Sequence, residues 1–386
     1  MCISLHNIKA NKNTSVFLDG DLSHAESRRG GEFFSRKERI DRKGWKRVRL
    51  GDVLKNVGWC NSTHPQSRQV PQISQGDDTG EVSITTDYYH PAYPVILFGD
   101  HTCNVKYIDF NCMILGDGVK LLAPKRKVFS TRFLYYLVQH MASKLSLGYS
   151  RHLAVLKELE CVVPCYEDQR KIETAIIFCD AHLVALQKLI AKYEAIKKAT
   201  VNLLLKPKEG WRRIRLDDCC MCLDNMRKPV NEEMRQSMKG DIPYCGANGI
   251  VDYVNDYTIN DSVILIAEDG GYFDEYQTRS IAYMIIGKAW VNNHAHILKA
   301  KNGYCQDYIF HTLEHKNIVP FITSGTRAKL TKRELLNIEI NAPESVYEQR
   351  KIAAQISAID NALNDCRAQL AKAQSLKQGM MSYFFG

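Results

Sequence analysis

The chain contains the segment GWKRVRLGD at residues 44–52 and nearly the same segment, GWRRIRLDD, at residues 210–218. Six of the nine positions are identical, and two of the other three exchange Lys for Arg or Val for Ile. A second pair follows, with QRKI at residues 169–172 and again at residues 349–352. Solenoid repeats are only about 20–50 residues long, whereas these copies lie 166 and 180 residues apart. The sequence therefore predicts two similar domains, each followed by the same kind of element.

That element is predicted to be a long helix, because apolar residues recur at alternating steps of four and three after each QRKI segment. This spacing forms a heptad seam, the pattern of helices that pack lengthwise against a partner. The main seam positions are Ile172, Ile176, Leu183, Leu186 and Ile190 in the first copy, and Ile352, Ile356, Ile359, Leu363 and Leu370 in the second. Lys197 and Lys377 interrupt the two seams at equivalent positions.

Each helix is expected to cover about 40 residues, from near Cys165 to Leu205 and from near Ser345 to Phe385. At the rise of an α-helix this corresponds to roughly 60 Å. Because the two seams share one register, the simplest arrangement is an antiparallel coiled coil within the chain. The alternative is that each helix docks separately on its own domain.

The repeat sets the expected domain boundaries. We assign residues 1–43 to a loosely ordered extension, 44–163 to a first globular unit, 164–206 to the first long helix, 207–342 to a second globular unit and 343–386 to the second long helix. The extension has three open interpretations: a tether, a partner contact or a start-site artefact. Residues 93–100 and 262–267 are strand-like, and residues 131–141 and 307–314 are helix-like. The expected fold class is α+β, with two pseudo-repeated domains separated by two long helices.

Composition limits the function classes only weakly. With 52 Lys and Arg against 43 Asp and Glu, the net charge of +9 permits a nucleic-acid partner but also suits an ordinary soluble enzyme. We find no run of about 18 apolar residues and no apolar signal core, so we expect no membrane span and a cytoplasmic location. In that reducing compartment the 13 cysteines are interpreted as free thiols.

Motifs for catalysis are missing. The sequence contains no G-x-x-x-x-G-K-[S/T] phosphate loop, no tetrapeptide of the amino-methyltransferase type and no H-E-x-x-H. The pair Cys219 and Cys222 has zinc-ligand spacing but lacks a second such pair. His294 and His296, two residues apart, would share one face of a strand, but no carboxylate or third ligand lies nearby in the sequence. We therefore expect neither a catalytic residue nor a metal site.

The ordered, doubled set of motifs resembles the specificity subunits of type I restriction–modification enzymes, from Gly44 to the C-terminus. The resemblance rests on the Gly-Trp openings, on the QRKI entry to each helix shortly after Pro164 and Pro343, and on segments such as IPYCGANGI at residues 242–250 and AEDGG at residues 267–271. It implies that each globular unit is a target-recognition domain for one half of a split DNA site. The helices would set the spacer between the half-sites.

The same resemblance implies a non-catalytic chain with partner subunits. Two modification subunits would bind S-adenosylmethionine and methylate adenine, and restriction subunits would use ATP and Mg²⁺ to translocate and cut DNA. This chain would bind none of these cofactors. Because the two globular units diverge strongly between their shared motifs, the half-sites should differ, which predicts an asymmetric, bipartite target.

Candidate DNA contacts are basic or polar residues at equivalent places before each long helix. Glycine-started loops there contain Tyr149, Ser150, Arg151 and His152 in the first half, and Thr326, Arg327 and Lys329 in the second. Expected phosphate contacts are Lys125, Arg126, Lys127, Lys332 and Arg333, and weaker candidates for base contacts are Asn248, Asn292, Asn293 and His294. Solvated loops are the alternative for each group. Gln169, Arg170, Gln349 and Arg350 are interpreted as structural or subunit-contact residues, with solvated first-turn residues as the alternative.

Three other functions remain open at this point. A methylation-only system would use the same DNA reader without a restriction partner. A self-contained nuclease or methyltransferase would need catalytic motifs that we do not find. A scaffold protein would use the paired helices to join other proteins and would have no DNA role.

Overall fold

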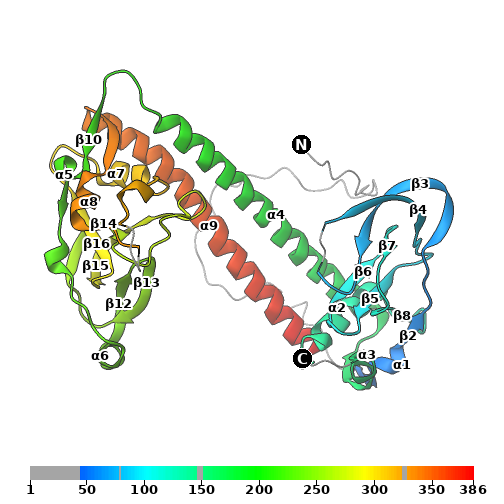
Figure 1. Ribbon diagram of the computed structural model, residues 1–386. Helices are drawn as coiled ribbons and strands as arrows, with labels where there is room; N and C mark the ends of the chain where they lie inside the picture. Colours follow the sequence, from blue (N-terminus) through cyan, green and yellow to red (C-terminus); the bar gives the residue numbers. More distant parts are fainter. Residues whose placement is uncertain (1–43, 78–79, 146–150, 324–327) are drawn as a thin grey trace, which may run out of the picture.

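The computed structural model describes residues 44–77, 80–145, 151–323 and 328–386. Two α+β domains lie at opposite ends of a pair of long helices (Figure 1). The predicted extension at residues 1–43 lies outside the described residues, as do four of the candidate DNA contacts, Tyr149, Ser150, Thr326 and Arg327.

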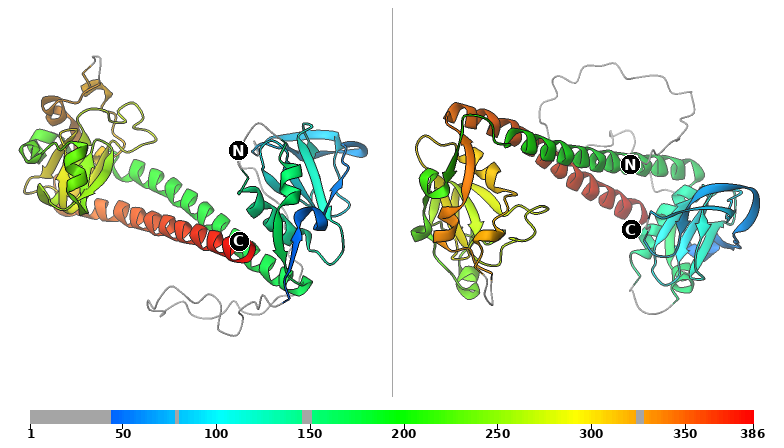
Figure 2. Two further views of the ribbon diagram at one scale, coloured as in Figure 1. Left: turned by 90° about the horizontal axis from the view of Figure 1, so that it is seen from below. Right: turned by 45° about the horizontal axis from the view of Figure 1, so that its top comes forward.

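The two long helices are α4 (Tyr166–Leu204) and α9 (Val346–Phe385), with ends within one residue of the expected ones. They run antiparallel and lie side by side, as Figures 1 and 2 show from three directions. Every predicted seam residue is buried or half-buried, while most of the positions between them are exposed. Ile176 and Ile356 are fully buried at the two ends of the pair. The helices therefore pair within the chain; whether they also supercoil stays a prediction.

The first domain contains two small sheets and a covering helix. A four-stranded sheet has the order β2-β8-β5-β6, and a three-stranded sheet has the order β4-β3-β7. Helix α2 contacts strand β6 of the first sheet and packs against both α4 and α9. The elements are β1 (Lys46–Arg49), α1 (Leu50–Val53), β2 (Leu54–Val57), β3 (Ser62–Ile73), β4 (Val82–Tyr88), β5 (Val95–Gly99), β6 (Val105–Ile108), β7 (Met113–Ile114), β8 (Val119–Pro124), α2 (Thr131–Ala142), α3 (Leu153–Glu158) and β9 (Glu160–Val163).

The second domain is built around one larger sheet. Its six strands have the order β11-β16-β14-β15-β12-β13, in which β12 and β15 run parallel and the other neighbours are antiparallel. The elements are β10 (Trp211–Arg215), α5 (Leu216–Cys219), β11 (Cys220–Cys222), η1 (Asp224–Met226), α6 (Glu232–Ser237), β12 (Lys239–Gly246), β13 (Gly249–Val254), β14 (Ile259–Ala267), β15 (Ala282–Val291), β16 (Ala295–Ala300), α7 (Gln306–Leu313), η2 (Val319–Phe321), α8 (Lys332–Asn337) and β17 (Glu339–Pro343).

The repeated Gly-Trp segments form the strand that closes each domain. Strand β1 pairs antiparallel with β9, and β10 pairs in the same way with β17. Since β9 and β17 lead directly into α4 and α9, each pair brings the start of a domain to its exit. Both copies of this motif thus pair the first strand of a domain with its last strand. This shared role explains why the two copies are more similar in sequence than the sheet-forming segments of the two domains.

Each domain also contacts the helix that it does not lead into. At the far end of α9, Met381, Phe384 and Phe385 are buried in the core of the first domain, where the Phe385 ring lies 5.5 Å from that of Phe133. At the far end of α4, Val201 and Leu204 pack against the core beside the second domain. Each long helix therefore begins at one domain and ends packed against the other.

Helix α4 has a property that the composition did not suggest. Among the described residues it is the one helix long and apolar enough to cross a membrane, by length and composition alone. This differs from the expectation drawn from the absence of a long uninterrupted apolar run. In the structure α9 lies along the seam side of α4, and Asp180 of α4 forms an ion pair with Lys377 of α9.

Candidate nucleic-acid interface

Three of the predicted DNA contacts meet at one edge of the second domain, at the turn after β14. Asn248 donates a hydrogen bond through Nδ2 to the Gly270 carbonyl oxygen at 2.8 Å. The Nδ1 atom of His294 lies 2.7 Å from Oδ1 of Asp269, and Nζ of Lys329 lies 2.7 Å from Oε1 of Glu268. Residues from three separate segments of the chain thus surround this turn.

Arg227 is the centre of this edge, and the sequence analysis missed it. Its guanidinium forms ion pairs with both Glu268 and Asp224, and it donates to the Asn293 carbonyl oxygen at 3.3 Å. Burial alone would raise the pKa of the Glu268 carboxyl, but hydrogen bonds from Lys329 and Arg227 hold that pKa below its usual value. Glu268 is therefore a carboxylate, and the edge combines fixed charges of both signs.

The glycine-started loops of the two halves return to equivalent places. In the second half the backbone N–H of Leu330 donates to the Glu268 carbonyl oxygen at 2.8 Å, at the end of β14. In the first half the backbone N–H of His152 donates to the Asp100 carbonyl oxygen at 2.9 Å, directly after β5. The side chain of Asp100 also accepts from the Leu153 N–H at 2.9 Å. In both halves, a residue at or directly after the end of this segment thus bonds to the backbone at the C-terminal end of a strand, β5 or β14.

The remaining candidates divide by exposure. Exposed side chains, which are available for contact, belong to Lys125, Arg126, Lys127, Arg151, Asn293, Lys329, Lys332 and Arg333. Two candidates are buried: His152 is 4% exposed and Asn292 is 8% exposed. Oδ1 of Asn292 accepts from the His294 N–H at 2.9 Å, which holds the turn before β16. For these two residues a structural role fits better than the expected contact with DNA, because a buried side chain does not reach a base edge.

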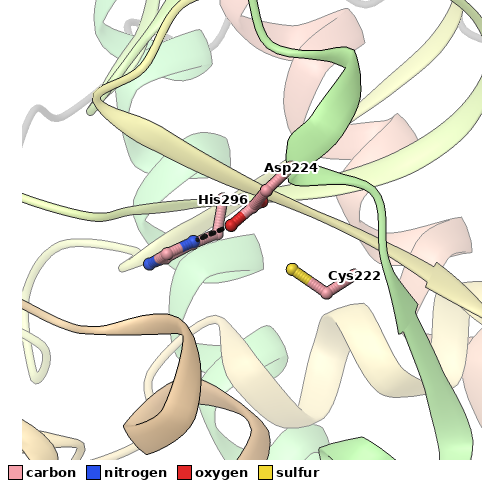
Figure 3. A group of neighbouring side chains, drawn as sticks. All are labelled: Cys222, Asp224 and His296. Atoms are coloured by element: carbon pink, nitrogen blue, oxygen red, sulfur yellow. Dashed lines mark hydrogen bonds and ion pairs between the residues drawn. The ribbon is translucent and has the colours of Figure 1, made fainter.

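The two histidines at positions 294 and 296 do not act together. His294 points to Asp269, whereas His296 meets Asp224 and lies near Cys222 (Figure 3). The spacing predicted that both side chains lie on one face of a strand. This prediction is wrong, because β16 begins at Ala295 and His294 lies in the preceding turn. The carboxylate and third ligand that the local sequence lacked are thus supplied to His296 by a distant segment, at the end of β11 and the start of η1.

Cys222, Asp224 and His296 have the spacing of metal ligands, but their contacts already account for the arrangement. His296 is 1% exposed; its Nε2 faces the Leu330 carbonyl oxygen at 2.8 Å and its Nδ1 faces Asp224 at 2.7 Å. Both ring nitrogens of His296 thus already lie within hydrogen-bonding distance of an oxygen of the chain. Burial raises the pKa of the Cys222 thiol to about 11, so this sulfur stays protonated at neutral pH. The cluster is a buried hydrogen-bonded contact that joins Asp224, His296 and the backbone at Leu330.

This ionic network should contribute strongly to the stability of the second domain. We expect Arg227→Met to lower the free energy of unfolding by roughly 2–3 kcal/mol, because it removes one partner from each of two half-buried carboxylates, while Lys329 still pairs with Glu268 and His296 still contacts Asp224. The matched control is Arg279→Met: Arg279 and Glu275 form an exposed ion pair, for which the loss should stay under about 1 kcal/mol. Urea titration measures both values, and equal losses would contradict the prediction.

The stability lost in Arg227→Met should become smaller as the pH is lowered. Hydrogen bonds and opposite charges outweigh the effect of burial and hold the pKa values of Asp224 and Glu268 below their ordinary values. Their stabilising contribution is therefore complete above the unfolded-state values of about 4 and is lost as the pH falls below them. The difference between the wild-type chain and Arg227→Met should shrink on acidification through that range.

The glutamines of the QRKI segments are buried at the joints between domains and helices. Gln169 accepts from the Ser130 N–H at 2.9 Å and donates to the Pro164 carbonyl oxygen at 3.0 Å. Gln349 accepts from the Cys305 N–H and donates to the Pro343 carbonyl oxygen, both at 2.9 Å. Both side chains are 1% exposed, which fits the structural interpretation and not a subunit contact. Arg170 and Arg350, by contrast, are exposed.

The chain is similar to proteins of known families. Residues 208–373 match the family model described as the type I restriction modification DNA specificity domain. A Haemophilus influenzae protein, provisionally named a type I restriction enzyme specificity subunit, is 41% identical over 128 residues; this match covers 33% of the present chain and 32% of the relative. The crystal structure of the S subunit of a type I restriction–modification system from M. genitalium aligns with a TM-score of 0.67 at 15% identity, covering 92% of this chain and 98% of that one.

Proposed function

We propose that this chain, whose residues 208–373 belong to the type I restriction modification DNA specificity domain family, is the DNA sequence-recognition subunit of a type I restriction–modification complex. The observation that carries the proposal is the placement of two unlike α+β domains at the two ends of one antiparallel helix pair. Such a molecule holds two reading surfaces at a fixed separation.

The dimensions suit a split DNA site. Helix α4 has 39 residues and is therefore about 60 Å long, which exceeds the 34–36 Å of one turn of duplex. The two domains have different sheets, one pair with four and three strands and one sheet with six. Surfaces that differ in this way favour two half-sites of different sequence, separated by bases that neither domain reads.

The partners belong to the proposal as well. The side of α4 away from the seam exposes apolar side chains, with Phe178 67%, Val184 47% and Ile177 40% exposed. An exposed apolar stretch of this kind is typical of a protein–protein contact. We assign it to modification subunits, two of which would bind the pseudo-symmetric helix pair, with restriction subunits added to the complex. The chain would act in the cytoplasm and bind no cofactor itself; S-adenosylmethionine, ATP and Mg²⁺ would bind to those partners.

The subunit contact can be tested with one substitution. We expect Phe178→Asp to weaken binding of a modification subunit at least about tenfold, because it places a charge in an apolar contact. The fold should survive, since this side chain is 67% exposed. Ile286→Asp, at a 78% exposed position on β15 of the second domain, is the matched control and should bind normally. Copurification and titration calorimetry measure the difference; normal assembly of Phe178→Asp would place the contact elsewhere.

Genome-wide base-modification sequencing of cells with and without this gene tests the function. The proposal expects a split motif with methylated adenines that disappears on deletion. A methylation-only system would give the same result without restriction of foreign DNA. A scaffold without a DNA role would leave the modification pattern unchanged while its partners still copurify. Methyl transfer by the purified chain alone, with S-adenosylmethionine and DNA, would show an enzyme and overturn the proposal.

A further inference from the structure

Two lysines occupy positions on the helix pair where the heptad pattern calls for apolar residues. The apolar steps of the two seams end at Tyr193 and Ala373, three residues after Ile190 and Leu370. Lys197 and Lys377 lie four residues after these positions, where the next apolar residue would stand. Both side chains are largely buried: that of Lys197 is 18% exposed and that of Lys377 is 25% exposed. A lysine on a seam costs stability, and in coiled coils a single polar seam residue is the usual device that selects one register.

Each of these lysines forms an ion pair with an aspartate of the other helix. Nζ of Lys197 on α4 lies 2.7 Å from Oδ1 of Asp360 on α9. Nζ of Lys377 on α9 lies 2.5 Å from Oδ1 of Asp180 on α4. Lys377 corresponds to Lys197, and Asp360 to Asp180, by the same sequence offset that relates the two QRKI segments. The two ion pairs are therefore one interaction, present twice in a pseudo-symmetric helix pair.

Each ion pair also contacts a side chain of one of the two domains. In the first domain the hydroxyl of Tyr136 on α2 donates to Oδ2 of Asp180 at 2.9 Å. This junction thus joins α4, α9 and α2. Its three partners come from three segments that are distant in the sequence.

The second junction is built in the same way with different residues. Lys197 lies 2.9 Å from Oε1 of Glu314, at the end of α7 in the second domain. His311 of α7 is 2.8 Å from the other Glu314 oxygen and 2.9 Å from Oγ of Ser357 on α9. His311, Glu314 and Asp360 have the spacing of metal ligands, but the ammonium of Lys197 already supplies a cation between the two carboxylates.

The apolar seam alone does not define one register. Its pattern repeats every seven residues, so a slip of one heptad would again match apolar residues with apolar residues. Such a slip moves one helix by about 10 Å along the other, at about 1.5 Å per residue. In the slipped register both lysines would lose their aspartates and would lie against apolar seam residues, which is strongly unfavourable for a desolvated charge.

We propose that these two junctions are specificity determinants: together with the docked ends of the helices they fix the register of α4 against α9 and so set how many base pairs separate the two half-sites. The proposal rests on the proposed function. Duplex DNA rises about 3.4 Å per base pair, so a one-heptad slip corresponds to about three base pairs. The four charged residues are positioning residues, because they act through the contact between the two helices.

The test is binding of the complete modification complex to duplexes that contain both half-sites with spacers from three base pairs shorter to three longer. We expect the wild-type complex to prefer one spacer at least about tenfold over its neighbours. A variant with Lys197→Leu, Lys377→Leu and Asp180→Asn keeps an apolar seam and should lower this preference at least about threefold, with each half-site still read correctly. In the otherwise wild-type chain, Lys377→Asp combined with Asp180→Lys reverses one ion pair and should keep the wild-type preference.

The control and a second measurement separate the possible failures. Arg367→Leu removes the exposed interhelical ion pair with Glu194, whose side chains are 53% and 52% exposed, and should leave the spacer preference unchanged. Small-angle scattering of the free chain reports the domain separation without DNA and should show a broader distribution for the triple variant. A folded triple variant with the wild-type separation and spacer preference would overturn the inference. A wild-type complex that ignores both half-sites would instead overturn the proposed function, while the scattering result would still decide whether the junctions fix the register.

Discussion

Exchange of residues 207–342 for the equivalent domain of a relative should change one half-site of the target and leave the other unchanged. The expected effect is large: the new half-site should replace the old one, and the original target should lose binding by about a thousandfold or more, the usual gap between specific and non-specific DNA binding. Methylation patterns in cells that express the exchanged chain measure this outcome directly.

The structure supports such independence because the two domains have separate cores. The core of the second domain includes Leu216, Ile264 and Leu298, whereas that of the first includes Leu50, Phe98 and Phe133. The exchanged unit meets the rest of the chain at one end of the helix pair. There α7 packs on α9, and Val201 and Leu204 of α4 pack beside the domain. The Cys305 N–H bonds to Gln349, and Glu314 forms an ion pair with Lys197.

Those contacts define the design of the experiment. The incoming domain should keep a glutamate at the place of Glu314 and a histidine at the place of His311, since Lys197 and Ser357 would otherwise lose their partners. The reciprocal exchange of residues 44–163 is the control and should change only the other half-site. If either exchange altered both half-sites together, the modular assignment of one domain to one half-site would be wrong.

The long helices were predictable because their signals are local. The seams repeat at steps of four and three without interruption, from Ile172 to Tyr193 and from Ile352 to Ala373, with no proline inside. The strands β5 and β14 and the helices α2 and α7 were also recognisable, since short apolar or periodic runs ended by turn residues define them within one segment. The α+β class and the doubled plan followed from these elements.

The candidate site was predictable only in part, because its contacts join distant segments. Arg227 and Glu268 form one ion pair across 41 residues, and His296 meets Asp224 across 72. Only a hint existed for Glu268 and Asp269, in the AEDGG segment at residues 267–271. Charged residues such as Asp224 and Arg227 look solvated in a sequence, and the tertiary fold alone shows that they are buried partners of each other.

The burial of Lys197 and Lys377 is a related case. The sequence showed that they interrupt the seams at equivalent positions, but the aspartates that receive them lie off the main seam. Only the antiparallel alignment of the helices brings residue 180 opposite residue 377. The position of a charge within a periodic pattern was therefore predictable, and its partner was not.

The last turn of α9 should stabilise the first domain, although the two lie at opposite ends of the described sequence. Phe385 is 5% exposed and Phe384 is 3% exposed, and both belong to the core that contains Phe133 and Leu137. We expect Phe385→Ala to lower the free energy of unfolding of the first domain by about 3–5 kcal/mol, through lost burial and the cavity left behind. The change should lower its melting temperature by roughly 10 °C or more.

Hydrogen exchange measured peptide by peptide tests where this loss occurs. Peptides of α2 and β5 should lose protection in Phe385→Ala, while peptides of β14 and β16 in the second domain should keep theirs. Tyr383→Ala removes a neighbouring aromatic side chain that is 53% exposed and should change little. A uniform loss across both domains would mean that the chain unfolds as one unit, and no loss in the first domain would show that its core is complete without α9. The expected pattern would instead show that the last turn of α9 is a structural part of the first domain, so that α9 links both domains in one closed arrangement.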